Sequence, residues 1–151
     1  MRVVVQRVRG AQVRVHGHSI GIIGLGLVVL IAVGKNDTKD DAVWMARKVA
    51  GLRVFANHDQ KMTQSVQEVG GSLLVISQFT LYGDVARGYR PNFSQSAPPM
   101  DARVLYEEFV AQLKDSGVLV ETGQFGADMD LELINWGPVT VIIDSPTESA
   151  T

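Results

Sequence analysis

The fold of this chain is constrained most by an uninterrupted apolar run, residues 25–33 (Leu-Gly-Leu-Val-Val-Leu-Ile-Ala-Val). The run is far shorter than the roughly 20 residues that a helix needs to cross a bilayer. A strand with one face in water alternates apolar and polar residues, and this run does not alternate. We therefore expect a soluble protein in which residues 25–33 form a strand covered on both faces.

Several other segments have the pattern of strands. In residues 11–16, Ala11, Val13 and Val15 alternate with polar residues, which is the two-residue period of a half-buried strand. Strands are expected at residues 2–8, 11–16, 52–55, 72–79, 118–122, 129–134 and 139–143, in addition to 25–33. Residues 135–138 (Asn-Trp-Gly-Pro) are expected to form a tight turn between the last two strands, because proline cannot extend a ladder.

Two helices are expected between these strands. Asp37 or Thr38 can cap the first helix. Its apolar residues follow the i, i+3, i+4, i+7 spacing of an amphipathic helix: Ala42, Met45, Ala46 and Val49. The second helix is expected to begin at Asp101 and to end at Gly117. Its apolar stripe consists of Leu105, Tyr106, Phe109, Val110 and Leu113. Residues 82–100 are expected to form a long irregular loop, and such loops are usually functional or disordered.

These elements predict an α+β fold with a largely antiparallel, barrel-like sheet and two main helices, because strands and helices do not alternate in regular βαβ units. The chain has 151 residues, of which 46% are hydrophobic, and this fits a single domain. We expect this domain to comprise residues 1–144, followed by a polar C-terminal tail at residues 145–151.

The net charge of −2 limits the function classes. Proteins that bind long stretches of nucleic acid usually carry a basic surface. If this protein binds RNA, it is therefore expected to contact a short region such as one end, and no DNA or membrane partner is expected. The chain has no cysteine, which excludes disulfides and fits a cytoplasmic location. The first residues also lack the pattern of a signal peptide.

The sequence contains no conventional hydrolase motif. Among His16, His18 and His58 the first two are expected to share a strand face, but no third ligand lies at a recognised metal spacing. No serine lies in a Gly-x-Ser-x-Gly elbow. We therefore expect neither a metal nor a cofactor.

Two polar clusters remain as candidates. Ser77, Gln78 and Thr80 close the expected strand 72–79, where they either cap the sheet edge or face a ligand. Arg87 and Arg90 alternate with aromatic residues in the long loop. This arrangement suits stacking on a base and pairing with a phosphate, although a solvated loop pinned by its aromatics is an equal alternative.

The residues at these places resemble a known family. Ser77-Gln78-Phe79-Thr80-Leu81 and Asn135-x-Gly137-Pro138-x-Thr140 resemble the two signature motifs of the D-aminoacyl-tRNA deacylases. The likeness extends to Gln6-Arg7-Val8, Arg87-Gly88-x-Arg90-Pro91-x-Phe93 and Gly123-x-Phe125-Gly126-Ala127-x-Met129. It covers the chain from residue 1 to about residue 143, and five motifs in the right order are more specific than any one alone.

The resemblance implies a homodimer that hydrolyses the ester between a D-amino acid and the 3′-terminal adenosine of tRNA. In that family the bond before the matching proline is cis, and the turn of one subunit enters the active site of the other. The carbonyls of Gly137 and Pro138 are then expected to reject an L side chain, with Arg7 holding the turn. Glycine has no side chain to reject, so glycyl-tRNA is an expected substrate. Ser77-Gln78 favours the strictly D-selective branch.

The resemblance also assigns the remaining site residues. Ser77, Gln78, Phe79 and Thr80 are the expected catalytic segment. Contacts with substrate or tRNA are expected from Arg87, Arg90, Phe125, Ala127, Met129, Asn135 and Thr140. Thr80 is expected to orient the substrate, because no base lies at a readable spacing to activate it. An aminoacyl ester is already activated, so a placed water, backbone N–H groups near Phe79 and Thr80, and the substrate's own 2′-hydroxyl can suffice.

Two alternatives stay open. One is a module that binds the 3′ end of tRNA without chemistry, which the missing nucleophile favours. The other is a hydrolase of small D-amino-acid esters, for which the loop around Arg87 and Arg90 is dispensable.

Overall fold

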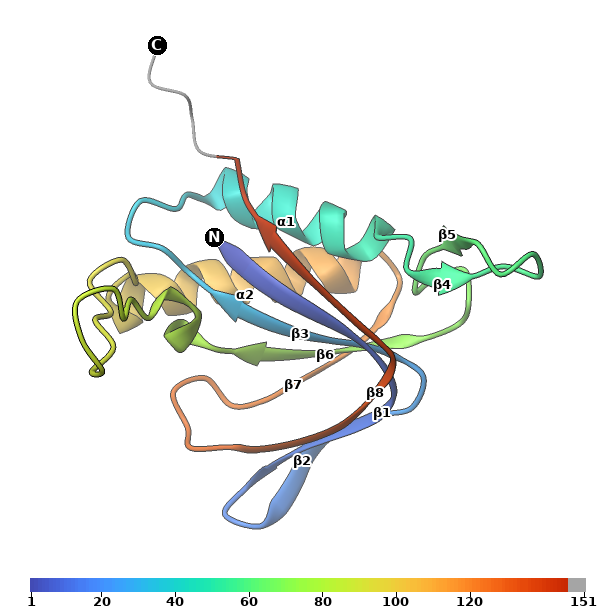
Figure 1. Ribbon diagram of the computed structural model, residues 1–151, viewed down its shortest axis with the longest axis horizontal. Helices are drawn as coiled ribbons and strands as arrows, with labels where there is room; N and C mark the ends of the chain where they lie inside the picture. The colour runs from blue at the N-terminus through green and yellow to red at the C-terminus, as the bar shows by residue number, and fades with distance from the viewer. Residues whose placement is uncertain (147–151) are drawn as a thin grey trace.

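The computed structural model describes residues 1–146 and consists of two helices packed on a strongly curved sheet (Figure 1). The elements in chain order are β1 (Arg2–Val15), β2 (His18–Ile23), β3 (Gly26–Ala32), α1 (Lys39–Gly51), β4 (Phe55–Ala56), β5 (Met62–Gln64), β6 (Ser72–Ser77), the 3₁₀ helix η1 (Phe79–Tyr82), α2 (Pro99–Asp115), β7 (Leu119–Thr122) and β8 (Asp130–Asp144). The expected α+β class with two main helices and a barrel-like sheet is confirmed.

The sheet is mixed, so the prediction of a largely antiparallel sheet is wrong. Its order is β2-β1-β3-β6-β7, and β8 also pairs with β1. β1 is antiparallel to β2, β3 and β8, whereas β3–β6 and β6–β7 are parallel. The reason is the order of the elements in the chain: α1 connects β3 to β6, and α2 connects β6 to β7. Each helical crossover returns the chain to the same end of the sheet, as parallel pairing requires.

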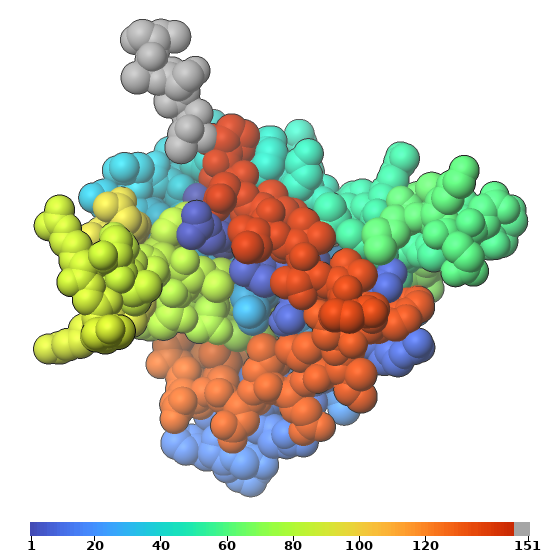
Figure 2. Space-filling model, in the orientation of Figure 1, coloured from blue at the N-terminus to red at the C-terminus, as the bar shows by residue number. Residues whose placement is uncertain are grey.

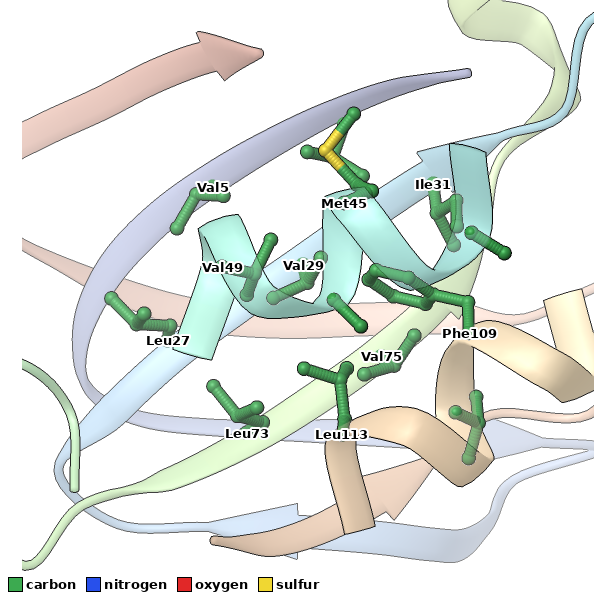
Figure 3. Packing of buried hydrophobic residues seen from close by; sticks show 14 of the residues in the cluster. Val5, Leu27, Val29, Ile31, Met45, Val49, Leu73, Val75, Phe109 and Leu113 are labelled. Carbon is green, nitrogen blue, oxygen red and sulfur yellow. The ribbon is translucent and has the colours of Figure 1, made fainter. Parts of the chain in front are cut away.

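The long apolar run forms β3, and it is covered on both faces as predicted. Its odd-numbered residues face the helices, where the main core cluster includes Val5, Leu27, Val29, Ile31, Met45, Val49, Leu73, Val75, Phe109 and Leu113 (Figure 3). Val28 instead belongs to a second apolar cluster, together with Val8, Val13, Leu74 and Ile76. A strand between two apolar clusters cannot alternate in polarity, which explains the unbroken run.

Two expected pairs of strands are each one continuous strand. Residues 2–8 and 11–16 merge into β1, and residues 129–134 and 139–143 merge into β8. The expected turn at residues 135–138 is therefore wrong, because both halves of β8 pair with β1 in the same direction. Four residues, 136–139, lie opposite the single residue Arg7, and we call them the β8 bulge.

Other boundaries shift by a few residues. The strand expected at residues 72–79 ends at Ser77, since Phe79 begins η1. The strand expected at residues 52–55 is found as the short β4, which pairs with β5. His16 lies in the turn before β2 with a φ of 49°, so the expected strand face shared with His18 is not formed.

Both helices agree well with the sequence. α1 has Thr38 as its N-cap, and its buried residues are the four expected ones, Ala42, Met45, Ala46 and Val49. α2 begins two residues before the expected Asp101, because Pro99 is favourable in the first helical turn. Gly117 follows its end with a φ of 89°, a conformation that glycine adopts readily.

The first residue of the chain is hydrogen-bonded to Ser145, just after β8. The Met1 ammonium group contacts the Asp37 carboxylate and donates a hydrogen bond to the Ser145 hydroxyl at 2.8 Å. Residues 147–151, most of the expected polar tail, lie outside the described residues. Within residues 1–146, neither helix combines the length and hydropathy needed to cross a bilayer.

Candidate active site

A cavity of about 690 Å³ lies at the carboxyl ends of the parallel strands β3 and β6. Ile31 and Ala32 at the end of β3, with Val33 after it, form one wall, and Ser77 at the end of β6 and Gln78 after it form another. The first half of α2 and the connection between β7 and β8 also contribute residues to the lining of the cavity. Ligands of doubly wound proteins bind at the carboxyl ends of parallel strands, and small-molecule sites have similar volumes.

Six of the residues expected from the sequence line this cavity: Ser77, Gln78, Phe79, Phe125, Ala127 and Met129. They come from two segments that are far apart in the chain. Residues 77–79 lie at the end of β6, and residues 125–129 lie just before β8. Thr80 is not part of the lining, but its hydroxyl accepts a hydrogen bond from the Gln78 side-chain amide at 2.5 Å.

The polar segment after β6 has a defined geometry. The Gln78 N–H donates to the Ile31 carbonyl at 2.7 Å, which extends the pairing of β3 and β6 by one residue. Phe79 then begins η1, so the N–H groups of Phe79 and Thr80 lie at the start of a helical turn, where no intrahelical acceptor exists. The Ser96 hydroxyl donates to the Phe79 carbonyl at 3.2 Å and holds η1 beside the cavity.

Tyr106 is a cavity residue that sequence reasoning assigned only to the apolar stripe of a helix. It is 6% exposed, and its ring packs on Phe125 with centroids 5.4 Å apart. Its hydroxyl is buried without a hydrogen-bond partner in the described part of the chain. Burial raises the pKa of Tyr106 to about 12, which the neighbouring Thr122 side chain partly opposes, so the hydroxyl stays protonated at neutral pH. Nothing in the spacing of Tyr106 distinguishes it from a core residue.

Phe93, Ser96 and Asp128 also line the cavity. Phe93 was included only as part of a family-like motif, and the other two were not identified. The Phe93 ring meets the Phe79 ring edge-on, with centroids 5.1 Å apart. Asp128 occupies a variable position between two motif residues, so its place beside the cavity follows from the fold rather than from a local pattern.

The β8 bulge is the second candidate feature. The Gly137–Pro138 peptide bond is cis, and both residues are exposed. Arg7, which is 7% exposed, donates from Nε to the Trp136 carbonyl at 2.9 Å. Its Nη1 donates to the Val54 carbonyl at 2.7 Å. The bulge is thus tied to β1 and to the segment before β4 by one side chain.

Asn135 and Thr140 lie on either side of the bulge. The Asn135 side chain accepts a hydrogen bond from the Val139 N–H at 2.7 Å and donates to the Thr140 hydroxyl at 3.0 Å. These bonds connect the two ends of the bulge. Their geometry gives both residues a structural role in addition to the contact with substrate that the resemblance implies.

The cavity and the bulge of one chain are separate. Gln6 pairs with Val28 on one side and with Thr140 on the other, so the bulge lies near the level of Val28 along the sheet. The cavity wall begins at Ile31, three residues further along β3, which is roughly 10 Å at the rise of a strand. Arg7, Gly137 and Pro138 are not part of the cavity lining.

Arg87 and Arg90 are exposed in the loop between η1 and α2, and neither lines the cavity. In the chain the two arginines lie between Phe79 in η1 and Phe93 in the loop, both of which line the cavity. The two arginines therefore lie beyond the rim, where they can contact a ligand that extends out of the cavity.

The fold and the site define an α+β protein with a cavity of small-molecule size at the carboxyl ends of its parallel strands. A model of the D-Tyr-tRNA(Tyr) deacylase family matches residues 4–144. A D-aminoacyl-tRNA deacylase of Chlorobaculum tepidum is 52% identical over 147 residues, which cover 97% of this chain and 98% of the relative. A D-aminoacyl-tRNA deacylase of Bacillus licheniformis is 53% identical over 145 residues, which cover 96% and 99%. The chain belongs to the D-Tyr-tRNA(Tyr) deacylase family.

Two solved structures share the fold over nearly the whole chain. A protein described as c-Myc DNA unwinding element binding protein has a TM-score of 0.92 and 38% sequence identity, with 97% of this chain and 100% of that chain covered. A probable eukaryotic D-amino acid tRNA deacylase has a TM-score of 0.82 and 20% identity, with 94% and 97% covered. The second similarity concerns the fold alone.

Proposed function

We propose that the protein hydrolyses the ester bond between a D-amino acid and the 3′-terminal adenosine of tRNA, releasing the D-amino acid and the tRNA. The observation that carries this proposal is the cavity, which brings two family-like segments, residues 77–79 and 125–129, onto one surface. Its volume of about 690 Å³ is large enough for an adenosine with an attached aminoacyl group. Gln78 and Phe79 seat the adenosine in this arrangement.

The reaction needs no protein nucleophile. A water oxygen attacks the ester carbonyl carbon, the bond to the ribose oxygen breaks, and the proton passes to that oxygen with help from the neighbouring 2′-hydroxyl. The N–H groups of Phe79 and Thr80 at the start of η1 stabilise the negative charge on the carbonyl oxygen. Thr80 orients this segment through its bond with Gln78, because no basic side chain is hydrogen-bonded to its hydroxyl in the described residues.

Selection for the D configuration comes from the β8 bulge. The carbonyls of Gly137 and Pro138 face the substrate's α-amino group, so an L side chain collides with backbone and a D side chain points outward. Glycyl-tRNA is accepted on the same reasoning, because glycine has no side chain to collide. Selectivity of this kind rests on a repulsive element that backbone atoms supply.

The gate acts on the cavity of a second copy of the chain. The separation of the bulge from the cavity within one chain, together with the exposure of Gly137 and Pro138, supports this arrangement. A two-fold dimer then contains two equivalent sites, each made from the cavity of one subunit and the bulge of the other. The protein acts in the cytoplasm, where charged tRNA is used.

Hydrolysis of D-tyrosyl-tRNA and L-tyrosyl-tRNA by the pure protein tests the proposal. We expect release of D-tyrosine at a kcat/KM at least about a hundredfold above that for L-tyrosine, because a steric clash of a few kcal/mol gives this ratio. Glycyl-tRNA is expected to react like the D substrate. Equal rates for the two tyrosyl substrates contradict the chiral gate. Binding of tRNA without hydrolysis favours a 3′-end binding module instead.

A further inference from the structure

Residues 84–92 form a closed projection that we call the arm. Asp84 and Asn92 pair at its base, and each N–H donates to the other's carbonyl at 2.8 Å. The Asp84 side chain also accepts a hydrogen bond from the Ala86 N–H at 2.8 Å. Figure 2 shows this yellow-green segment standing out from the body of the molecule. The base of the arm is therefore ordered by hydrogen bonds, and its tip is free to meet a partner.

The tip of the arm presents one aromatic ring and two cations to solvent. Tyr89 is fully exposed, at 104% of the reference area, and Val85 is 58% exposed. Arg87 and Arg90 lie on either side of Tyr89 in the chain and are exposed. Among residues 1–146, neither arginine forms an ion pair with a carboxylate. A bare tyrosine between two uncompensated guanidinium groups is typical of a surface that binds an anionic, aromatic partner.

Both ends of the arm lie near cavity residues in the chain. Only Gly83 separates the arm from η1, whose first residue Phe79 lines the cavity. Phe93 comes immediately after Asn92 and lines the cavity in edge-on contact with Phe79. A nucleotide chain whose terminal residue occupies the cavity must leave it past its rim. The nucleotides before the terminal adenosine are unpaired in tRNA, so their base faces are available for stacking.

We propose that Tyr89 is the stacking platform for the unpaired nucleotide that precedes the terminal adenosine, with Arg87 and Arg90 binding its flanking phosphates. This inference rests on the proposed function and assigns the RNA contact outside the cavity. The overall charge of −2 agrees with a contact limited to one short basic segment. Tyr89 is a positioning residue, since it lies away from the ester and acts through the placement of the RNA end.

Paired substrates test the inference. The variants Tyr89→Ala, Tyr89→Phe and Val85→Ala are compared on D-tyrosyl-tRNA and on D-tyrosyl-adenosine, which lacks the preceding nucleotides. For Tyr89→Ala we expect a KM for the tRNA substrate raised about 5–100-fold, the range that loss of one base stack produces, with kcat nearly unchanged. Hydrolysis of D-tyrosyl-adenosine is expected to stay at the wild-type value. Tyr89→Phe keeps an aromatic ring that can stack. Val85→Ala removes an exposed apolar side chain of the arm but leaves Tyr89 in place. Both variants are therefore expected to match the wild type.

A binding measurement decides the inference even if the protein hydrolyses nothing. The Kd for a fluorescent RNA hairpin with a single-stranded CCA 3′ end is expected to rise by a similar factor in Tyr89→Ala. In Arg87→Ala/Arg90→Ala the dependence of log Kd on log salt is expected to be weaker than in the wild type. Equal affinity of Tyr89→Ala and wild type for this RNA overturns the inference. An equal loss of activity of Tyr89→Ala on D-tyrosyl-tRNA and D-tyrosyl-adenosine also overturns the inference. A change in the oligomeric state of Tyr89→Ala overturns it as well, because the arm then serves self-association. Failure of the wild type on both ester substrates contradicts the proposed function alone.

Discussion

Arg7 holds Trp136 in two ways at once. Its Nε donates to the Trp136 carbonyl at 2.9 Å, and its guanidinium lies 4.2 Å from the centroid of the indole ring. No carboxylate is paired with Arg7 in the described residues, and its other bond is to the Val54 carbonyl. Burial lowers the pKa of Arg7, and the neighbouring Arg9 adds to the effect. The shape of the β8 bulge therefore depends on a buried cation that binds backbone carbonyls.

Arg7→Ala is expected to lower the free energy of unfolding by about 2–4 kcal/mol, because two carbonyls lose a charged donor and a cavity remains. Selectivity for D-tyrosyl-tRNA over L-tyrosyl-tRNA is expected to fall in the same variant, since the bulge is no longer fixed. Denaturant unfolding and the two hydrolysis rates measure these effects. Arg9→Ala is the control: Arg9 is exposed and stacks on the same indole at 4.6 Å, so about 0.5–1 kcal/mol is expected. Similar losses in both variants contradict the special role of Arg7.

Gly137→Ala is expected to deform the bulge. Gly137 has a φ of 134°, which side-chain-bearing residues rarely adopt, and an added Cβ lies 2.8 Å from a Val139 methyl and 3.0 Å from an Arg7 nitrogen. The backbone strain alone costs about 1–3 kcal/mol. We expect a lower Tm, and a large loss of hydrolysis because the displaced carbonyls of residues 137 and 138 no longer position the substrate's α-amino group. Gly24→Ala serves as the control, because nothing lies within 4 Å of its added Cβ. Wild-type activity in Gly137→Ala is the result that excludes the bulge from the site.

Local patterns in the sequence determine the parts of this fold that were predicted well. The spacing of Ala42, Met45, Ala46 and Val49 and the cap at Thr38 are sufficient to define α1, and all four residues are buried as expected. The unbroken run in β3 likewise reports that both faces are covered. In each case the signal lies within one element.

The parts that were predicted wrongly depend on pairing between distant segments. Gly137 and Pro138 have the composition of a turn, but their flanks pair with one strand, and the extra residues are accommodated opposite Arg7. The parallel pairing of β6 with β3 depends on the crossover through α1, and residues 72–77 alone do not encode that direction. Tyr106 lies in the stripe of α2 like its core neighbours, so only the assembled fold identifies it as a cavity residue.

Thr80→Ala tests whether the protein supplies a nucleophile. If Thr80 only orients the segment through its bond with Gln78, kcat is expected to fall by no more than about tenfold, the value of one hydrogen bond. Thr80→Ser retains the hydroxyl and is expected to stay near the wild-type rate. A loss of about a thousandfold or more in Thr80→Ala, with activity kept in Thr80→Ser, indicates covalent catalysis and contradicts the proposed mechanism.

The half-buried Tyr82 and the buried Tyr106 predict a pH dependence of stability. Burial raises the pKa values of Tyr82 and Tyr106 to about 12, whereas tyrosines in the unfolded chain ionise near 10. Between these values the unfolded state binds fewer protons, so the free energy of unfolding is expected to fall as the pH rises from about 10 to about 12. Unfolding measured across this window checks the sign, and stability that rises there contradicts the assignment.

Tyr106→Phe separates the contributions of Tyr106 and Tyr82 to the pH dependence of stability. Part of the decline in stability above pH 10 is expected to disappear, because one buried hydroxyl is gone. At neutral pH the variant is expected to be at least as stable as the wild type, since that hydroxyl has no hydrogen-bond partner in residues 1–146. A clear loss of stability of Tyr106→Phe at neutral pH contradicts this expectation and shows that the hydroxyl forms a hydrogen bond in solution.

Mixing two variants, each expected to lose hydrolysis through damage to a different half of the site, tests the central claim that one site combines the cavity of one subunit with the bulge of another. Gln78→Ala damages the cavity and keeps the bulge, whereas Gly137→Ala damages the bulge and keeps the cavity. After equal amounts are unfolded together and refolded, about half of the dimers are mixed and one of their two sites is intact, so about a quarter of wild-type D-tyrosyl-tRNA hydrolysis is predicted. If the mixture is no more active than the two variants apart, the shared site is contradicted.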